Sequence, residues 1–372
     1  MTPQFSGKLG VIQRVLPEYR APFFTSLAKS CTGGLSLAFG EPRAVENIRT
    51  TMKVDNVALV KTNNLHFLNG QLYLCYQQGL ENWLEAYQPD ALIVEANPRY
   101  LSTPKAIQWM HSLNRPVLGW GLGISTSTSL LTRQRRHFLN QFDGLIAYSQ
   151  KGAQEYAKTG FNPQSIFVAY NAVTHKPKQP LPQKNDSIQG APIVLFVGRL
   201  QERKRVDDLI RACAKIPCQF KPELWVIGEG PVKSSLENLA SQIFPNTRFF
   251  GALFGDELAS KFLQADLFVL PGTGGLAIQQ AMSYGLPIIV ARGDGTQNDL
   301  VRPTNGWQIS PNNVDELVQT MITALSNPLE LQNKGIESYR IVSEEINIEN
   351  MVSVFIQAIQ HAQEKFATRQ VL

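Results

Sequence analysis

The chain has 372 residues, 43% of them hydrophobic and 17% charged, so it can bury large cores and is too long for one ordinary domain. Its formal net charge of +5 is modest, and the sequence has no recognisable nucleic-acid-binding motif, so we expect no nucleic-acid partner. No apolar run approaches the roughly eighteen residues that cross a bilayer, and the first residues lack the apolar core of a signal peptide. We therefore expect a cytoplasmic protein of two domains.

Short apolar runs alternate with amphipathic helical stretches along the chain, which predicts parallel sheets covered by helices. In the first half the predicted strands are KLGVIQRV, GLSLAF, ALIVEA, PVLGWG, GLIAYS and SIFVAY. In the second half they are PIVLFVG, ELWVIG, TRFFGA, LFVLPG and PIIVARG. Each half should form a doubly wound, Rossmann-like α/β domain, and ligands of such domains bind beyond the carboxyl ends of the strands.

The domain boundary is predicted from a stretch rich in Pro, Lys, Gln and Asn, THKPKQPLPQKNDSIQGAP. We expect an N-terminal domain over residues 1–175, a linker over 176–190 and a C-terminal domain over 191–343. Residues 344–372 carry apolar side chains at near-helical spacing and predict a closing helix that can pack back on the N-terminal domain.

One segment of the first half is strongly basic. TRQRRHF places Arg133, Arg135, Arg136 and His137 on about two turns of a predicted helix. Such a face can contact anionic lipid headgroups or an anionic substrate, or can simply be solvated.

The second half places cations directly after a buried strand. VLFVGRLQERKRVDDLI carries Gly198, Arg199 and Lys204 between the strand and the next helix. Arginine can grip a diphosphate with its planar guanidinium, and lysine adds a compact, mobile charge. ELWVIGEGP then places Gly228 at the end of the following strand, where the backbone can approach a ligand closely.

A glycine-rich turn follows a later strand of the same half. LFVLPGTGGLAIQQAMSYG contains Gly272, Gly274 and Gly275 before a helix that is predicted to begin near Leu276. The free amides and the positive dipole end of that helix suit a diphosphate. Tight turns also need glycine for conformational reasons, so the function is indicated by the combination of two cations and this turn.

These motifs, in their order and spacing, resemble the donor domain of retaining GT-B glycosyltransferases of the family 4 type, also called glycosyl transferases group 1. The resemblance covers almost all of residues 191–330, through VGRLQERKRVDDLI, LWVIGEGP, ELASKFLQADLFVLPGTGGLAIQQAMSYGLPIIV and NGWQI. In the first half, IQRVLPEYRAPFF, VEANPRYLS, VLGWGLGIS and FDGLIAYSQKGAQEYAKTGFNPQSIFVAYNAV are similar to the acceptor half of these enzymes. The resemblance implies a GT-B fold, in which two Rossmann-like domains face a central cleft, and transfer of a hexose from a nucleotide-diphosphate sugar with retention. It also implies no metal and no cofactor, and the chain contains no Asp-x-Asp pair.

The sequence departs from the family where the sugar is bound. The family has two glutamates around the glycine turn, and the matching positions here hold Gly272 and Gln280. Gln280 can still accept a hydrogen bond from the ribose, whereas Gly272 leaves the sugar to backbone amides and Thr273. In GWGLGIS, Leu122 replaces a histidine of many relatives. One interpretation is a subfamily with different sugar contacts, and the other is a degenerate enzyme. We favour the first because the residues for the diphosphate are kept together.

Site roles follow from the strand ends and from the resemblance. Arg199 and Lys204 are predicted to stabilise the leaving diphosphate, and Glu95 to orient or deprotonate an acceptor hydroxyl, unless it only pairs with Arg99 or a helix end. The predicted donor-binding residues are Gly198, Gly228, Leu253, Gly272, Thr273, Gly274, Gly275, Leu276 and Gln280. The predicted acceptor-binding residues are Tyr19, Arg20, Asn97 and Arg99.

We therefore expect a glycosyltransferase of polysaccharide biosynthesis that acts on a glycan or lipid-linked acceptor at the inner face of the membrane. Arg133, Arg135 and Arg136 would make the peripheral membrane contact. The alternative is a noncatalytic GT-B protein that binds a nucleotide sugar or a partner enzyme. A GT-B epimerase would be expected to carry more acid–base residues than these strand ends offer.

Overall fold

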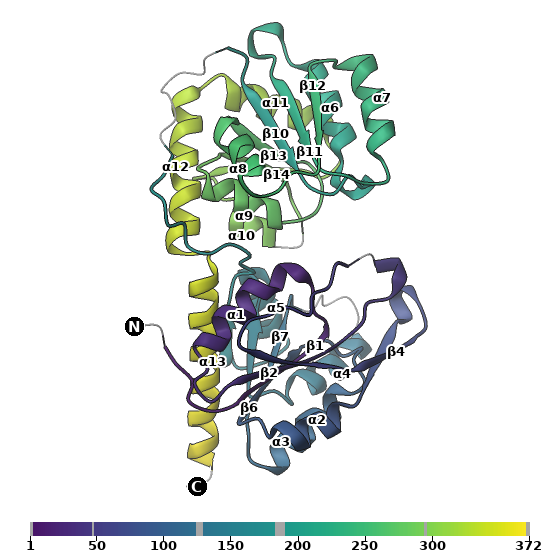
Figure 1. The fold of residues 1–372 in the computed structure, drawn as a ribbon, viewed down its shortest axis with the longest axis vertical. Coiled ribbons are helices and arrows are strands. Elements are labelled where there is room, and N and C mark those ends of the chain that lie inside the picture. The colour runs from purple at the N-terminus through teal and green to yellow at the C-terminus, as the bar shows by residue number, and fades with distance from the viewer. Residues whose placement is uncertain (1–2, 47, 124–128, 183–189, 294–295, 370–372) are drawn as a thin grey trace. The chain divides into compact units, whose positions relative to one another are not determined.

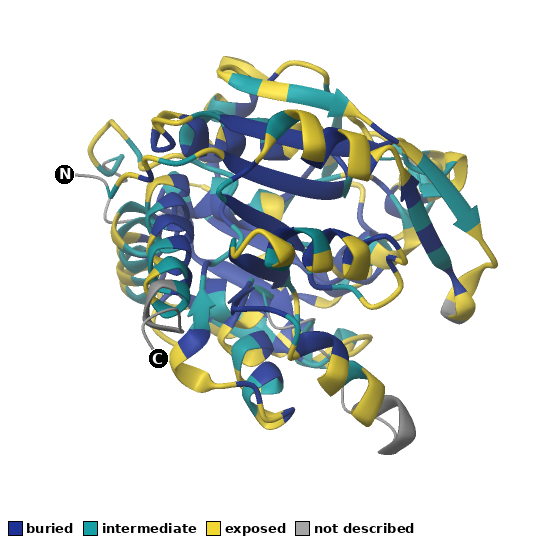
Figure 2. Cartoon of the chain, turned by 90° about the horizontal axis from the view of Figure 1, so that it is seen from below, coloured by how far each residue is buried: buried dark blue, intermediate teal, exposed yellow. Residues whose placement is uncertain are grey.

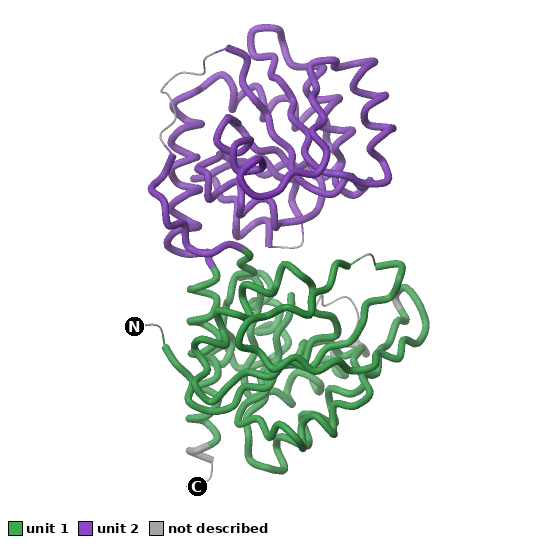
Figure 3. Tube along the Cα trace, viewed as in Figure 1, with its two compact units in different colours: residues 1–173, 348–372 green, residues 174–347 purple. Residues whose placement is uncertain are grey.

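The computed structural model describes residues 3–46, 48–123, 129–182, 190–293 and 296–369 (Figure 1). These residues form two compact units (Figure 3). Unit 1 comprises Met1–Val173 and Ile348–Leu372, and unit 2 comprises Thr174–Asn347. The Pro-rich stretch of the predicted linker thus begins unit 2, and the chain returns to unit 1 only for its last helix.

Unit 1 is built on a seven-stranded parallel sheet in the order β3-β2-β1-β6-β7-β8-β9. Its strands are β1 (Leu9–Val15), β2 (Leu35–Gly40), β3 (Val57–Lys61), β6 (Ala91–Glu95), β7 (Val117–Gly121), β8 (Gly144–Ala147) and β9 (Ile166–Val168). An antiparallel hairpin, β4 (Asn63–Phe67) and β5 (Leu74–Gln78), lies outside this sheet. The runs predicted as strands all pair in the sheet, and β3 is an additional edge strand.

Helices cover both faces of this sheet, as a doubly wound fold requires. The helices of unit 1 are α1 (Ala21–Lys29), α2 (Leu80–Tyr87), α3 (Thr103–Ser112), α4 (Ser129–Leu139), α5 (Gln150–Lys158) and α13 (Ile348–Arg369). One face packs on α1 and α13 and the other on α2 and α3, so each side has its own apolar cluster. The central strands β1, β2, β6, β7 and β8 are mostly buried, whereas the edge strands β3 and β9 are not, and Figure 2 shows buried residues in dark blue.

Unit 2 has a six-stranded parallel sheet in the order β12-β11-β10-β13-β14-β15. Its strands are β10 (Ile193–Val197), β11 (Glu223–Ile227), β12 (Thr247–Gly251), β13 (Leu267–Leu270), β14 (Ile288–Ala291) and β15 (Gly306–Ile309). Its helices are α6 (Val206–Lys215), α7 (Lys233–Ile243), α8 (Gly255–Gln264), α9 (Leu276–Ser283), α10 (Thr296–Leu300), α11 (Val314–Leu325) and α12 (Pro328–Glu344). Within each sheet the strand order reverses once, between β1 and β6 and between β10 and β13. Ligands of open α/β sheets bind beside such switch points.

Candidate functional site

The switch point of unit 2 brings together two segments that lie about seventy residues apart in the sequence. After β10, the chain passes through Gly198 and Arg199 into a short 3-10 turn, Glu202–Lys204. After β13 it forms residues 271–275, called here the glycine turn, and then enters α9. Because β10 and β13 are neighbours in the sheet, both segments emerge at the same edge.

The two segments are in direct backbone contact. The Thr273 amide donates a hydrogen bond to the Arg203 carbonyl oxygen over 3.0 Å. A methyl group on Gly272 would overlap that same carbonyl and lie 2.6 Å from the Lys204 Cα. Glycine is therefore required at position 272 for close approach, and this conformation leaves no room for the carboxylate that the family pattern has there.

The Lys204 ammonium lies over the glycine turn. A methyl group on Gly274, which has φ +135°, would overlap the Lys204 Nζ. Burial, together with the charge of Arg203, lowers the pKa of Lys204 to about 8. Within the described residues Lys204 forms no ion pair with a carboxylate, so it is a partly buried cation that lacks a compensating anion. Such a cation favours an anionic ligand.

The start of α9 adds partial positive charge beside this lysine. Its N-cap is Gly275, and no side chain caps the first amides. Arg203, which the sequence reasoning did not single out, reaches the Thr273 hydroxyl at 3.4 Å from its Nη1. A lysine, an arginine and uncapped helix amides at one strand edge form a set of donors suited to phosphate oxygens. The signal for Arg203 was present in the basic run ERKR, which also contains Lys204.

The other predicted donor residues are placed less centrally. Gly198 and Gly228 pack together, because a methyl group on Gly228 would overlap the Gly198 carbonyl oxygen. Arg199 is exposed after β10, and Leu253 is half-buried between β12 and α8. On α9, Leu276 is exposed and Gln280 is half-buried, while the adjacent Gln279 is buried.

The predicted residues of unit 1 gather at the switch point of its own sheet. Glu95, the last residue of β6, accepts a 2.5 Å hydrogen bond from the backbone amide of Arg14 in β1. Burial raises the pKa of Glu95 above its usual value. Within the described residues no ion pair joins Glu95 to Arg99, and the hydrogen bond that its carboxylate accepts comes from the Arg14 amide. A carboxyl group whose pKa is raised by burial, at the end of a strand beside the switch point, is a candidate acid–base group.

The predicted acceptor residues divide into a buried and an exposed set. Arg20 is buried, stacks 4.3 Å above the Trp120 ring and donates to the Tyr148 hydroxyl over 3.0 Å. Tyr19 is 39% exposed beside it. Asn97 accepts a hydrogen bond from the backbone amide of Arg99, and the Arg99 side chain is exposed. The loop of residues 124–128, which contains the end of GWGLGIS, lies outside the described residues, whereas Leu122 before it is 53% exposed.

The basic segment is part of α4, where Arg133, Arg136 and His137 are exposed and Arg135 is half-buried. Among the described residues, no helix combines the length and the apolar character that a bilayer crossing requires. The same residues contain no cluster of three or more His, Cys, Asp or Glu side chains suited to a metal ion.

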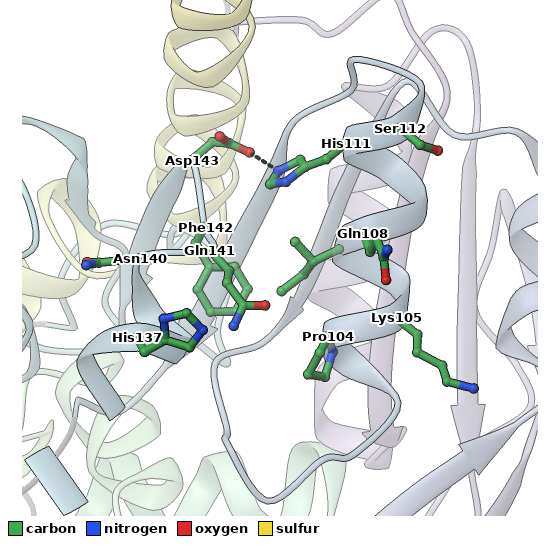
Figure 4. Close-up of a pocket in the computed structure, with 11 residues that line it drawn as sticks. Pro104, Lys105, Gln108, His111, Ser112, His137, Asn140, Gln141, Phe142 and Asp143 are labelled. Carbon is green, nitrogen blue, oxygen red and sulfur yellow. Dashed lines mark hydrogen bonds and ion pairs between the residues drawn. The ribbon is translucent and has the colours of Figure 1, made fainter. Parts of the chain in front are cut away.

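A cavity of about 750 Å³ lies between α3 and the segment that leads into β8 (Figure 4). It is lined by Pro104, Lys105, Ile107, Gln108, His111, Ser112, His137, Asn140, Gln141, Phe142 and Asp143. The Asp143 carboxylate accepts hydrogen bonds from His111 Nε2 over 3.0 Å and from the Val117 amide over 2.9 Å. These bonds pin the end of α3 to the amino ends of β7 and β8. That is the edge of the sheet opposite to the one where ligands bind in this class of fold, so we assign the pair a structural role.

Comparison with known proteins fits the geometry of unit 2. Residues 177–341 match the family model described as Glycosyl transferases group 1. These residues form a glycosyl transferases group 1 domain. The domain contains β10, the Glu202–Lys204 turn, the glycine turn and α9, and therefore the whole candidate site of unit 2.

Two curated relatives differ in how far they extend beyond this domain. A GDP-mannose-dependent monoacylated alpha-(1-6)-phosphatidylinositol monomannoside mannosyltransferase of Corynebacterium glutamicum is 24% identical over 66% of this chain and 67% of its own length. A sulfoquinovosyl transferase of Arabidopsis thaliana is 33% identical over 36% of this chain, and the match spans only 26% of that relative.

Structural similarity extends over both units. The crystal structure of Anabaena HepE in complex with UDP aligns with 97% of this chain and 99% of its own, at a TM-score of 0.67 and 17% identity. At this identity the likeness bears on the fold. It confirms the predicted α/β class with the GT-B fold, and the group 1 domain is its C-terminal half.

Proposed function

We propose that this protein is a glycosyltransferase that transfers a hexose, with retention, from a nucleotide-diphosphate sugar to a glycan or lipid-linked acceptor. The observation that carries the proposal is the position of the Lys204 side chain. This partly buried ammonium, which pairs with no carboxylate in the described part of the chain, lies on the glycine turn beside the uncapped start of α9, within a glycosyl transferases group 1 domain. HepE, which shares the fold, has been crystallised with UDP, and the relative from Corynebacterium glutamicum is described as GDP-mannose-dependent.

The roles of the residues follow from this arrangement. Lys204, Arg203 and the first amides of α9 would hold the diphosphate and stabilise the charge that develops as it leaves. Arg199, after the end of β10, would grip the diphosphate with its planar guanidinium. Gly274 and Gly275 would let the backbone approach the donor, and Gln280 would accept from the ribose. No metal is assigned a role, because the cations named here can neutralise the diphosphate.

Unit 1 would supply the acceptor site in this proposal. Glu95 would orient or deprotonate the acceptor hydroxyl, near Tyr19, Arg20, Asn97 and Arg99. In retaining transfer the leaving phosphate can itself take the acceptor proton, so catalysis depends more on positioning and charge than on a strong enzymic base. The exposed cations Arg133 and Arg136 of α4 would contact an anionic membrane surface that carries a lipid-linked acceptor.

The decisive experiment compares Lys204→Ala with Glu95→Ala. A panel of UDP- and GDP-sugars is incubated with the protein, and release of nucleoside diphosphate is measured with and without acceptor extract. We expect Lys204→Ala to lower kcat/KM by about 100-fold or more, because it removes a preorganised cation, and Glu95→Ala to lower it by less than about tenfold.

Lys215→Ala is the matched control, since Lys215 ends α6 far along the helix from the site and pairs with Asp315 over 2.7 Å. Equal losses in the Lys204 and Glu95 variants would contradict the role of Lys204. Binding of nucleotide sugars without any release in the presence of acceptor would instead favour the noncatalytic alternative, for which the missing glutamates at Gly272 and Gln280 are the motivating observation.

A further inference from the structure

Gln297 is a buried amide directly behind the glycine turn. It lies in α10, is 1% exposed, and its Nε2 donates to the Gly272 carbonyl oxygen over 3.2 Å. Its Oε1 occupies the space beside Gly293, where a methyl group would overlap it. The amide therefore lies between Gly272 and Gly293, and its hydrogen bond reaches the residue that touches the backbone of Lys204.

The contacts continue from Gly272 to the lysine without a break. Gly272 lies against the Arg203 carbonyl and the Lys204 Cα, and the next residue, Thr273, donates to the Arg203 carbonyl. The Lys204 Nζ then returns over Gly274. A shift of the Gly272 carbonyl therefore moves the backbone from which Lys204 projects and the surface on which its ammonium rests.

From this chain of contacts we infer that Gln297 is a positioning residue. Its hydrogen bond fixes the glycine turn, and the glycine turn then fixes the position of the Lys204 ammonium. The inference rests on the proposed function in one respect: it assumes that Lys204 is the cation that binds the diphosphate. Two features support a specific role. The donor comes from a different element than either segment of the site, and an amide can supply the donor without placing a second charge beside Lys204 and Arg203. The glycine turn itself carries no titratable side chain.

The test uses Gln297→Met, which preserves the length of the side chain and removes the donor, and Gln297→Glu, which replaces the donor with an acceptor. In the free full-length protein, the titration of Lys204 is followed by NMR on lysine labelled with carbon-13 at Cε, with Lys204→Arg to assign the signal. In the wild type we expect a midpoint at about 8. In Gln297→Met we expect the midpoint to move upward, toward about 10.4, because the ammonium leaves its buried seat. In Gln297→Glu it should move further, since the new carboxylate also stabilises the ammonium.

The second measurement is affinity for UDP and GDP as a function of pH. A lysine binds an anion only while protonated, so wild-type affinity should fall as pH rises through about 8. Gln297→Met should weaken binding about tenfold at pH 7 and should shift the pH midpoint with the NMR titration, with kcat/KM falling in parallel. If the role of Gln297 were purely structural, the substitution would lower the melting temperature and the folded fraction. The midpoint of the Lys204 titration in the molecules that remain folded would then be unchanged.

Gln264→Met is the control, because Gln264 is exposed in α8 and its side chain bonds to Ser260 one turn earlier in the same helix. An unchanged Lys204 midpoint in both Gln297 variants would overturn the inference whatever the enzyme does. A shifted midpoint in a protein whose wild type binds no UDP or GDP would uphold the positioning role and refute the proposed function.

Discussion

At position 272 the local backbone contact requires glycine, whereas the family pattern has a glutamate. A Cβ at this position would overlap the Arg203 carbonyl and the Lys204 backbone, so any side chain must displace one of the two loops. We expect Gly272→Ala to lower the free energy of unfolding of unit 2 by about 1–3 kcal/mol, the usual range for overpacking. Urea denaturation followed by circular dichroism measures this change.

Gly275→Ala provides a control within the same turn. The nearest atom to a methyl group there is the Leu300 Cδ1 at 3.7 Å, which is ordinary contact, so we expect a change within about 0.5 kcal/mol. Equal destabilisation by the two substitutions would show that position 272 is not specially restricted. Gly272→Glu should be no better tolerated than Gly272→Ala, because the collision begins at Cβ.

Sequence reasoning found Lys204 and the glycine turn because both follow buried apolar strands, and the carboxyl ends of parallel strands meet at one edge. It did not find Gln297, and no local signal could have revealed it. GDGTQND reads as a polar loop, and the hydrogen bond to Gly272 exists only because tertiary folding brings the two residues together across 25 positions of sequence. It also left open whether Glu95 is structural, since its Arg14 partner lies on another strand.

At the scale of elements, α13 completes the core of unit 1 from the far end of the chain. Phe355 is fully buried, with its ring 4.9 Å from both Phe23 and Trp120. We expect Phe355→Ala to destabilise unit 1 by about 3–5 kcal/mol, because it removes a large apolar side chain and leaves a cavity. Gln357→Ala, exposed on the same helix, should change stability by less than about 0.5 kcal/mol. Denaturation midpoints of the two variants measure the difference, and similar midpoints would mean that α13 is not part of this core.

The sequence predicts most readily the strands that contain apolar runs, including the half-buried edge strands β9 and β12. β10 and β13 are apolar along their length and pack on both faces, so their composition alone identifies them. β3 is only partly buried at the sheet edge, the β4 and β5 hairpin contains NNLHF and LCYQQ, and β15 is short and half polar. Such strands depend on their neighbours for stability, and propensity does not distinguish them from loops. The closing helix begins at Ile348, because Asn347 bonds back to the Val342 and Ser343 carbonyls at the end of α12.

For the whole molecule, the division into two units places the predicted roles on separate cores. Lys204, the glycine turn and Gln297 belong to unit 2, whereas Glu95, Arg20 and α13 belong to unit 1. Each sheet has its own apolar interior, and the chain passes between the units only after Val173 and after Asn347. A ligand held by one unit therefore stabilises that unit directly, and substitutions in the other core act on a different unfolding event.

This separation predicts two transitions in differential scanning calorimetry of the full chain. Phe355→Ala should lower one of them and so assign it to unit 1. Saturating UDP or GDP should raise the other, by about 2.7 kcal/mol of added stability at a concentration one hundred times Kd, because the nucleotide binds only the folded unit 2. Lys204→Ala should abolish the rise without moving the unit 1 transition, since the cation that meets the diphosphate is lost while the unit 1 core is intact. If the nucleotide raised the transition that Phe355→Ala lowers, the diphosphate would bind in unit 1, and the site built on Lys204 and the glycine turn would be wrong.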